Sequence, residues 1–509
     1  MPQFYSADVL KRNAWHFVGG KLLSAVLTFL LLMVMVRALS LPEYGAYVAM
    51  IASMELMLTL ADMGMHGAGY RYLPEFVLHA PDRALRRFLR RQISVYAGSI
   101  VLVSSLTLVF LGWVVEWLAL SEYSQVFVWL PFLMLVEGVG RLIRDQTFSV
   151  CMRQNDTRKV LLIKLLIQLA GLIFLWMQGR VSLQQVIWLE ILASSLALAW
   201  SLFCLRHFLR HRAATPVPGW REPGWDSMWR AGFNLYLATL VTQASGVTLL
   251  TVLLQKTMGP EAAGVFGFVK NLVEMVARYL PATLFFSILQ PKLVASGLES
   301  KSGLSAMVNM AGKVNLFVLL PLLVVFLVAG EPIVFYLSGG EVKGTGLLSF
   351  GLMLFLLPYS QRLLLETVAM VNDESRLCFY ASCLTPLGLA VFWLGGELAL
   401  GIWSTVAAIL FSAYVFVGAL IFMLTLRQHF LLDAQGFLRM LASAVAAYFV
   451  ALPFAGAAVW QLVLTGLAAA AGFTLSCLIC RAFSDEELAL FNGVAGRHVF
   501  RLREKPGGR

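Results

Sequence analysis

The chain has 509 residues, of which 59% are hydrophobic and 13% are charged, and its mean hydropathy is +0.79. Soluble domains average about 45–50% apolar and about 25% charged residues, so this composition excludes an ordinary soluble enzyme and predicts an all-α, polytopic membrane protein. The net charge of +11 is assigned to loops on one side of a membrane, because no soluble segment is long enough to form a basic face for nucleic acid.

Apolar runs predict about fourteen transmembrane helices, each close to the ~20 residues that cross ~30 Å of hydrocarbon. In chain order they are 16–36, 45–67, 94–118, 126–150, 159–178, 184–205, 231–255, 262–289, 313–337, 346–371, 377–396, 399–426, 437–456 and 458–480. The first is expected to be a retained anchor, because its apolar run is long and no small-x-small cleavage site follows it.

Lysine and arginine are distributed unevenly over the connecting segments. If the N-terminus is cytoplasmic, the outer loops hold only Arg37, Arg180, Lys256 and Lys343, and most of the other bases fall on inner segments. The positive-inside rule therefore predicts an even number of crossings, with both termini in the cytoplasm.

Two basic segments on the predicted inner side have amphipathic spacing. Residues 81–91 place Leu85, Phe88 and Leu89 opposite an arginine-rich face, and residues 484–503 begin with a capping-box spacing. Each is interpreted either as a helix that lies on the anionic inner leaflet or as a solvated charged face.

A sequence motif occurs twice, as VRALSLPEYGAYVAMIASME at 36–55 and QKTMGPEAAGVFGFVKNLVEM at 255–275. Each copy joins an apolar span to a Pro-Glu turn and then to a glycine that opens the next span. The repeat predicts two related six-helix lobes, a common transporter architecture, although convergent turn chemistry is an alternative. The predicted domains are an N-terminal lobe (1–205), a basic cytoplasmic linker (206–230), a C-terminal lobe (231–426), two additional transmembrane helices (427–480) and a basic cytoplasmic tail (481–509).

Ionisable residues inside the predicted spans are the most informative feature of the sequence. The bases are Lys21, Arg141, Arg144, Lys164, Lys270, Arg278 and Arg362, and the clearest acids are Glu55, Asp62, Glu137, Asp145, Glu190, Glu274 and Glu366. Exposing all of them to lipid would cost on the order of 40 kcal/mol, at roughly 2.5–3.5 kcal/mol each. They are therefore expected to face a wet cavity, to pair with one another or to lie near the interface.

The spacing of these residues favours a common lining. Glu137, Arg141 and Arg144 follow each other at i, i+4 and i+7, and Lys270, Glu274 and Arg278 follow at steps of four. A basic cavity open to the cytoplasm suits an anionic substrate, since arginine binds phosphate with two parallel hydrogen bonds.

The predicted substrate-binding residues are Arg141, Arg144, Lys270, Arg278, Arg362, Lys21, Lys164 and Gln243, and the ion-coupling candidates are Glu55, Asp62, Glu137 and Glu274. Burial can raise the pKa of a carboxyl group into the range where it binds protons. Two alternatives stay open: structural ion pairs such as Glu137–Arg141, Lys270–Glu274 and Arg362–Glu366, and snorkelling of Lys21 and Lys164.

Motifs for catalysis are not found in the sequence. There is no GxxxxGK[ST] loop, no HExxH and no nucleophile elbow. Cys477 and Cys480 have CxxC spacing but lie in an apolar run, which favours helix packing over metal binding. We expect a transporter rather than an enzyme, with no metal and no cofactor; coupling to protons, sodium or the membrane potential is left open.

The opening segments LTFLLLMVMVRALSLPEYGAYVAM (27–50) and ADMGMHGAGYRYLPE (61–75) resemble the polysaccharide-transporter branch of the multidrug/oligosaccharidyl-lipid/polysaccharide exporter superfamily, especially bacterial O-antigen and capsule oligosaccharide flippases. The resemblance implies two lobes around a central cavity, with the last two helices outside. It also implies translocation of an undecaprenyl-pyrophosphate-linked oligosaccharide from the inner to the outer leaflet of the bacterial inner membrane, for lipopolysaccharide or exopolysaccharide synthesis. Cationic cavity residues engage the pyrophosphate in such flippases, a role that fits Arg141, Arg144, Lys270, Arg278 and Arg362 by location.

The expected partners are this lipid-linked oligosaccharide, membrane lipids and a polysaccharide polymerase or assembly complex, without nucleic acid. A flippase for the peptidoglycan lipid precursor is the alternative transporter, and a cation-exporting drug antiporter fits the basic lining less well. A membrane-embedded glycosyltransferase and a non-transporting scaffold of an assembly complex are alternatives from other classes.

Overall fold

The computed structural model describes residues 7–211, 220–284, 293, 301–483 and 487. Within these residues every regular element is helical, which confirms the predicted all-α fold. The chain divides into two compact units, Met1–Phe268 and Val269–Arg509, called unit 1 and unit 2 below. The predicted helix at 484–503 and the end of the predicted span 262–289 fall outside the described residues, apart from Glu487.

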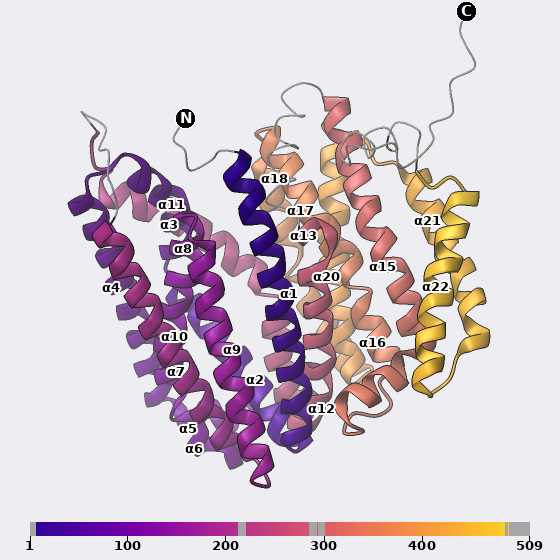
Figure 1. Cartoon of the computed structure of the whole chain (residues 1–509), viewed down its shortest axis with the longest axis horizontal. Coiled ribbons are helices and arrows are strands. Elements are labelled where there is room, and N and C mark those ends of the chain that lie inside the picture. Colours follow the sequence, from indigo (N-terminus) through magenta and orange to yellow (C-terminus); the bar gives the residue numbers. More distant parts are fainter. Residues whose placement is uncertain (1–6, 212–219, 285–292, 294–300, 484–486, 488–509) are drawn as a thin grey trace, which may run out of the picture. The chain divides into compact units, whose positions relative to one another are not determined.

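Unit 1 is built from long helices joined by short turns (Figure 1). They are α1 (Ala7–Ala38), α2 (Leu41–Ala61), α3 (Met65–His79), α4 (Asp82–Val109), α5 (Leu111–Trp117), η2 (Ser121–Tyr123), α6 (Ser124–Phe127), α7 (Leu130–Arg141), η3 (Leu142–Thr147), α8 (Phe148–Val150), α9 (Gln154–Met177), α10 (Leu183–His211), α11 (Trp225–Gln243) and the first part of α12 (Val247–Tyr279). Helix α7 packs against α4 and α10, and α9 packs against α1 and α10.

The predicted span 45–67 is wrong as a single helix. Helix α2 ends at Ala61, and α3 begins only at Met65 because Met63 and Gly64 have positive φ angles of 44° and 85°. A left-handed backbone stops an α-helix, and glycine adopts it without the steric cost that a Cβ brings. The hydrophobic pattern continues across this break, so the pattern does not predict where α2 ends.

The predicted span 231–255 is also broken. Helix α11 ends at Gln243, and α12 starts at Val247. Helix α11 packs against α3: the Tyr236 hydroxyl donates to the Leu60 carbonyl (2.9 Å), and the Trp229 indole donates to the Met63 carbonyl (3.2 Å). These contacts hold α11 over the break between α2 and α3, which local sequence does not encode.

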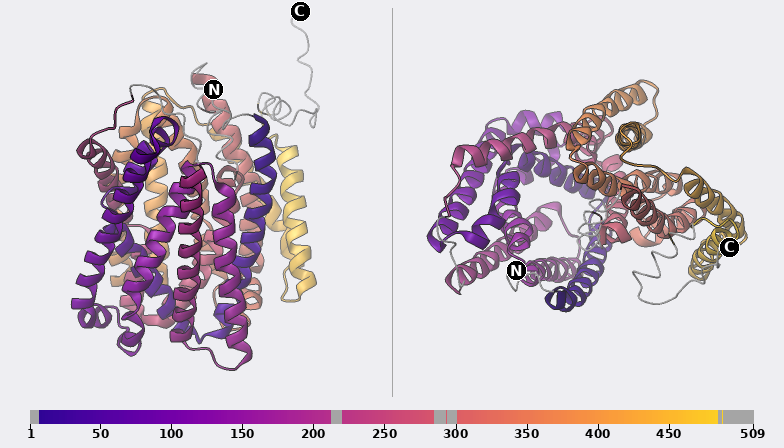
Figure 2. Two further views of the ribbon diagram at one scale, coloured as in Figure 1. Left: turned by 60° about the vertical axis from the view of Figure 1, so that its left-hand side comes forward. Right: turned by 90° about the horizontal axis from the view of Figure 1, so that it is seen from above.

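Unit 2 continues with the second part of α12. It then contains α13 (Pro281–Leu284), α15 (Lys301–Ser338), α16 (Gly346–Met353), α17 (Leu356–Val371), α18 (Ser375–Leu384), α19 (Leu387–Glu397), α20 (Ile402–Leu426), α21 (Ala434–Ala451), η4 (Leu452–Phe454) and α22 (Val459–Ile479). Helices α21 and α22 (yellow in Figure 2) run side by side, and both pack against α15.

Ten helical segments of the described chain are long and apolar enough to cross a membrane, or eleven if Ser121–Phe127 and Leu130–Val150, bent by 51°, count as one span. The predicted number of fourteen is not confirmed. Of the remaining predicted spans, 16–36 lies in α1, and 231–255 and 262–289 lie in α11 and α12; these three helices fall outside the ten. The protein is nevertheless a multi-pass membrane protein.

The boundary between the units falls inside α12 rather than in the predicted linker 206–230. The reason is the packing of α11 on α3 and of the early part of α12 on α2. Helix α10 extends to His211 and α11 begins at Trp225, so both helices reach into the predicted linker 206–230. That the chain contains two related six-helix lobes, as the repeated motif predicts, stays a prediction.

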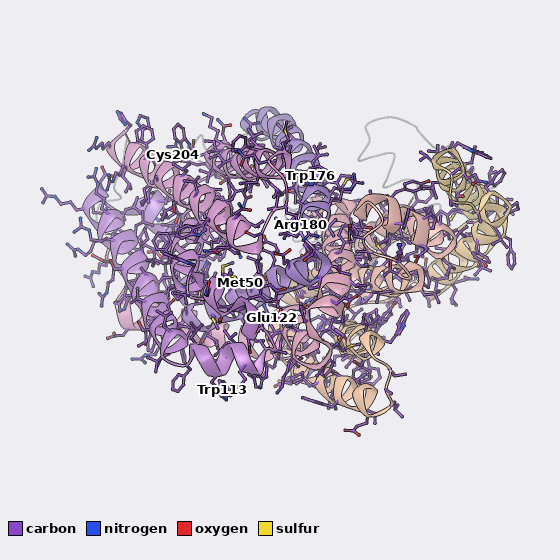
Figure 3. All side chains as sticks on the ribbon, turned by 90° about the horizontal axis from the view of Figure 1, so that it is seen from below. Met50, Trp113, Glu122, Trp176, Arg180 and Cys204 are labelled. Carbon is purple, nitrogen blue, oxygen red and sulfur yellow. The ribbon has the colours of Figure 1, made fainter. Side chains whose placement is uncertain are left out.

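Two exposed tryptophans lie at one end of unit 1. Figure 3 looks at this end, where Trp113, Trp176, Glu122 and Arg180 lie. Trp113 is 65% exposed and Trp176 is 42% exposed. Tryptophan prefers the boundary between hydrocarbon and headgroups, so this end of the helices meets a membrane interface.

Candidate functional site

Glu137 on α7 is the centre of a buried charge network in unit 1. Its carboxylate accepts hydrogen bonds from Arg141 Nε (2.8 Å), Lys164 Nζ (2.7 Å) and Ser194 Oγ (3.0 Å). The residue is 5% exposed. A buried carboxylate is tolerated when cations and donors replace its lost hydration, so these three partners stabilise its ionised form.

Lys164 on α9 lies between two carboxylates from two other helices. Its ammonium is 2.7 Å from Glu137 Oε2 on α7 and 3.0 Å from Glu190 Oε1 on α10. Gln168, one turn after Lys164, donates to Glu190 Oε2 at 2.5 Å. Lys164 is 8% exposed, so it is a buried ion-pair partner and does not snorkel toward an interface. The network ties α7, α9 and α10 together.

Three members of this network, Gln168, Glu190 and Ser194, are absent from the predicted site, and the last two share a helix. They lie four residues apart on α10, as Lys164 and Gln168 do on α9. Polar residues at i, i+4 on two apolar helices are the signal that would have found them, because such residues share one helix face.

Arg141 extends from the network to a more accessible surface. Its Nη1 lies 3.7 Å from Glu55 Oε1 on α2, and the two side chains are 35% and 38% exposed. The predicted pair Glu137–Arg141 is therefore present, but Arg141 also bridges α7 to α2. The network contains three carboxylates (Glu55, Glu137 and Glu190) and two cations, so its exposed edge keeps one carboxylate in excess.

Arg144 comes three residues after Arg141, the last residue of α7. It lies in η3, a π-helical segment between α7 and α8. A π-segment has a wider turn than an α-helix and is frequent at functional sites. Here Arg144 is 8% exposed, and its guanidinium contacts Asp145 at 2.7 and 2.8 Å. That Arg144 shares a lining with Glu137 and Arg141 stays a prediction.

Asp62 follows the last residue of α2, at the break before α3. Its carboxylate accepts from the His66 backbone N–H at 3.0 Å and contacts His66 Nδ1. It therefore helps to start α3, a capping role. The interruption at Met63 and Gly64 therefore separates Glu55, on α2, from His66, on α3, within the predicted span 45–67.

The predicted residues of α12 pair within their own helix. Lys270 Nζ is 3.1 Å from Glu274 Oε1, and Arg278 Nη2 is 3.9 Å from Glu274 Oε2. Arg278 is 64% exposed and Glu274 is 40% exposed. Spacing of four residues places these groups on one face, as predicted, and the arginine keeps most of its donors accessible.

Arg362 on α17 is half-exposed. Its Nε is 2.7 Å from Glu366 Oε1, and its guanidinium lies 4.2 Å from the centre of the Phe416 ring on α20. The side chain is 38% exposed. The aromatic face orients the guanidinium while part of it stays available to another ligand.

The two remaining predicted residues lie on other elements. Lys21 belongs to α1, and Gln243 is the last, half-buried residue of α11. The structure thus brings Glu55, Glu137, Arg141 and Lys164 together in unit 1, and Lys270, Glu274 and Arg278 together in unit 2. That these residues bind substrate or a coupling ion stays a prediction.

The two copies of the repeated motif lie against each other. A Cβ on Gly45 would lie 1.6 Å from the Pro260 carbonyl oxygen, and one on Gly264 would lie 2.6 Å from the Leu41 carbonyl oxygen. Glycine at both positions lets the start of α2 come into backbone contact with the part of α12 that follows its break at Gly259, where φ is 80°. Aligning the two glycines also matches Glu55 with Glu274, each ten residues later.

Two solved structures share this fold. One is described as "Lipid II flippase MurJ, inward closed conformation", with a TM-score of 0.70 and 13% identity over 94% of this chain and 99% of that chain. The other, "Inward-facing conformation of a multidrug resistance MATE family transporter of the MOP superfamily", has a TM-score of 0.55 and 14% identity over 79% of this chain and 96% of that chain. This chain therefore shares the overall fold of these two structures. No curated protein matches the sequence.

Residues 10–286 match the model of the family described as "Polysaccharide biosynthesis protein". This match covers more than half of the 509 residues. The chain belongs to the polysaccharide biosynthesis protein family, and the family predicted from residues 27–50 and 61–75 is confirmed.

Proposed function

We propose that this protein translocates an undecaprenyl-pyrophosphate-linked oligosaccharide from the inner to the outer leaflet of the bacterial inner membrane, by alternating access. Family membership supports a role in polysaccharide biosynthesis, and the fold supports a flippase mechanism. Both termini are proposed to be cytoplasmic, and a polysaccharide polymerase or assembly complex is the proposed partner that uses the product.

One observation carries the proposal: Arg141 and Arg362 are partly exposed within membrane-length segments. Their side chains are 35% and 38% exposed, and they lie within the bent pair Ser121–Phe127 and Leu130–Val150 and within the span Gly346–Val371. Guanidinium groups in contact with lipid would be costly, so we infer that both face water. A hydrated arginine with unused donors is suited to a diphosphate, which it binds with paired hydrogen bonds.

Coupling to an ion is a further part of the proposal. Of the predicted candidates, Glu55 and Glu274 are the accessible ones, because Glu137 is enclosed by two cations and Asp62 contacts His66. We propose that a proton or sodium ion binds at Glu55 or Glu274. The inside-negative membrane potential also favours outward movement of an anion, by ~2.3 kcal/mol per charge per 100 mV.

The first test is translocation of lipid-linked oligosaccharide in proteoliposomes. Arg362→Gln is expected to slow the initial rate by about tenfold or more, since a hydrogen bond to a charged group contributes about 1.5–3 kcal/mol. Arg180→Gln, at an exposed turn outside the site, is the control and should retain full activity. A folded Arg362→Gln protein that flips at the normal rate would remove the basis of the proposal.

The alternative substrate is the peptidoglycan lipid precursor, favoured by the shared fold with the lipid II flippase. Complementation separates the two. Rescue of cells that lack an oligosaccharide flippase supports our proposal, whereas rescue only of cells that lack the peptidoglycan-precursor flippase contradicts it. Turnover of a sugar donor by the purified protein would instead indicate a membrane-embedded glycosyltransferase, and failure in all three assays would favour a scaffold.

A further inference from the structure

Five arginines form an exposed row on the first turns of α4. They are Arg83, Arg86, Arg87, Arg90 and Arg91, here called the arginine ridge, and all are exposed. On the opposite side of the same turns, Leu85, Phe88 and Leu89 are 0%, 3% and 2% exposed. Of the two interpretations of residues 81–91, the helix that lies on the inner leaflet is wrong: these residues begin a continuous 28-residue helix whose apolar side packs inside unit 1.

The ridge lies at a defined depth along α4. Residues 92–109 contain no Asp, Glu, Lys or Arg, and their 18 positions rise about 27 Å, close to the thickness of the hydrocarbon. At about 1.5 Å per residue, Arg91 and Arg90 lie within about 3 Å of this boundary, and Arg87 lies about 7 Å beyond it. The headgroup layer is roughly 5–8 Å thick on each side, so these three residues lie at the depth of the lipid phosphates.

Two of the ridge arginines, Arg86 and Arg91, contact uncharged groups, which orient them and leave their charge uncompensated. Arg86 Nη2 donates to the Leu209 carbonyl at the end of α10 (2.6 Å), and the Arg91 guanidinium lies 4.1 Å from the Trp225 ring centre. A carbonyl and an aromatic ring hold a guanidinium without neutralising it. Both contacts favour an anionic ligand from outside the protein.

Acidic residues do not balance the ridge within the described part of the chain. Arg87 reaches Glu222 at 3.3 Å, with side chains 70% and 37% exposed, and Asp82 opens the helix. Such an exposed pair contributes little and is screened by water. Neighbouring segments that contact α4 add further exposed bases, namely Arg206, Arg210, Arg221 and Arg230.

We propose that the arginine ridge binds the phosphate groups of anionic glycerophospholipids, of the phosphatidylglycerol class, in the leaflet at this end of α4. Its depth selects a headgroup over a soluble anion, and its apolar side is already buried, so binding depends on guanidinium–phosphate contacts rather than on insertion. This site is separate from the charges at membrane depth and does not depend on the proposed substrate. A lipid-linked diphosphate shares the phosphate chemistry, and the experiment below distinguishes it.

Lipid binding to the purified full-length protein tests the proposal. Native mass spectrometry in mixed micelles of phosphatidylglycerol and phosphatidylcholine would measure the affinity for each lipid. Arg87→Gln/Arg90→Gln is expected to weaken phosphatidylglycerol binding about 25-fold, at about fivefold per arginine near a membrane surface. The phosphatidylcholine affinity should stay unchanged, and added salt should reduce the difference.

Unit 2 supplies a matched control. Arg427 resembles Arg87, since it is 63% exposed and 3.5 Å from Glu374, and Arg376 is exposed as Arg90 is. Arg376→Gln/Arg427→Gln removes the same charge, and phosphatidylglycerol binding is expected to change less than about twofold, because the ridge stays intact. Equal weakening in both double variants would mean that net charge alone matters and would overturn the proposal.

Two further measurements test whether binding depends on the charge of the ridge and whether its ligand is a phospholipid. Arg87→Lys/Arg90→Lys keeps both charges, so it should retain most of the binding even if the glutamine variant folds poorly; loss of binding in a folded lysine variant would contradict a charge-based site. Undecaprenyl pyrophosphate is the second probe. If the glutamine variant loses this probe but keeps phosphatidylglycerol, the ridge is a substrate site and the lipid proposal is wrong.

Discussion

Both units carry lysine, arginine and glutamate at membrane depth, but they use them differently. In unit 1, Lys164 joins Glu137 and Glu190 from two other helices and is 8% exposed. In unit 2, Lys270 pairs with Glu274 four residues later, on the same helix, and Glu274 is 40% exposed. The first arrangement holds three helices together, whereas the second restrains side chains on one helix, where the Glu274 side chain is partly exposed and the Lys270 side chain is 13% exposed.

The comparison separates charges that stabilise the fold from charges available to a ligand. The same residue types occur at similar spacing in the two units. The motif glutamates Glu55 and Glu274, for example, each follow a motif glycine by ten residues. What differs is the number of helices that contribute to each cluster and the access of water to it. Removing one partner of an ion pair that is buried between several helices costs more unfolding free energy than removing one partner of a partly exposed pair.

Lys164→Met is expected to have the largest effect. Its removal leaves Glu137 with Arg141 and Glu190 with only Gln168, so the unfolding free energy should fall by about 3–5 kcal/mol, the usual cost of breaking a buried ion pair. Lys270→Met is the matched control, with an expected loss below about 1 kcal/mol because its partner is partly exposed. Thermal unfolding of the detergent-solubilised proteins measures both. Equal losses of unfolding free energy in the two variants would show that the two clusters stabilise their units equally.

Gly45→Ala tests the contact between the two motif copies. Its Cβ would lie 1.6 Å from a backbone oxygen of Pro260, which cannot move as a side-chain tip does, so a loss of about 1–3 kcal/mol or more is expected from overpacking. Gly98→Ala is the control: nothing lies within 4 Å of its Cβ, and alanine favours a helix interior by about 0.5–1 kcal/mol. Unfolding midpoints that rise for both variants would show that α2 and α12 are not closely packed.

The smallest expected effect concerns a second buried lysine. Lys313 on α15 is fully buried and lies 2.6 Å from both Asp433 and Glu487, so unit 2 also contains a cation shared by two carboxylates. Burial alone would raise the pKa of Asp433, but hydrogen bonds from Lys313 and the Gly436 N–H lower it below its ordinary 3.8. An acid whose pKa is lower in the folded state adds stability above its unfolded pKa and loses it as the pH falls through the folded value.

Stability is therefore expected to decline as the pH falls from about 5 to below the ordinary pKa of Asp433. Asp433→Asn should flatten this decline, and Glu397→Gln, at an exposed position, should not. Unfolding midpoints measured across this pH range test the prediction. An unchanged decline in Asp433→Asn would show that Lys313 does not hold Asp433 in its ionised form, and would leave the network of unit 1 as the better-supported buried cluster.

The sequence by itself determined the all-helical membrane class, ten of the apolar spans, the family and the pairs Glu137–Arg141, Lys270–Glu274 and Arg362–Glu366. Hydrocarbon selects apolar runs, and residues four apart always meet on a helix, so these features follow from local pattern.

Tertiary structure decided the rest. Glu190 meets Lys164, Lys313 meets Asp433, and Gly45 meets Pro260 only because separate helices are packed together. The breaks at Gly64 and Gln243 and the π-helical turn at Arg144 interrupt patterns that read as continuous. Which charges are buried and which remain exposed depends on neighbours distant in the chain, and helical periodicity carries no information about them.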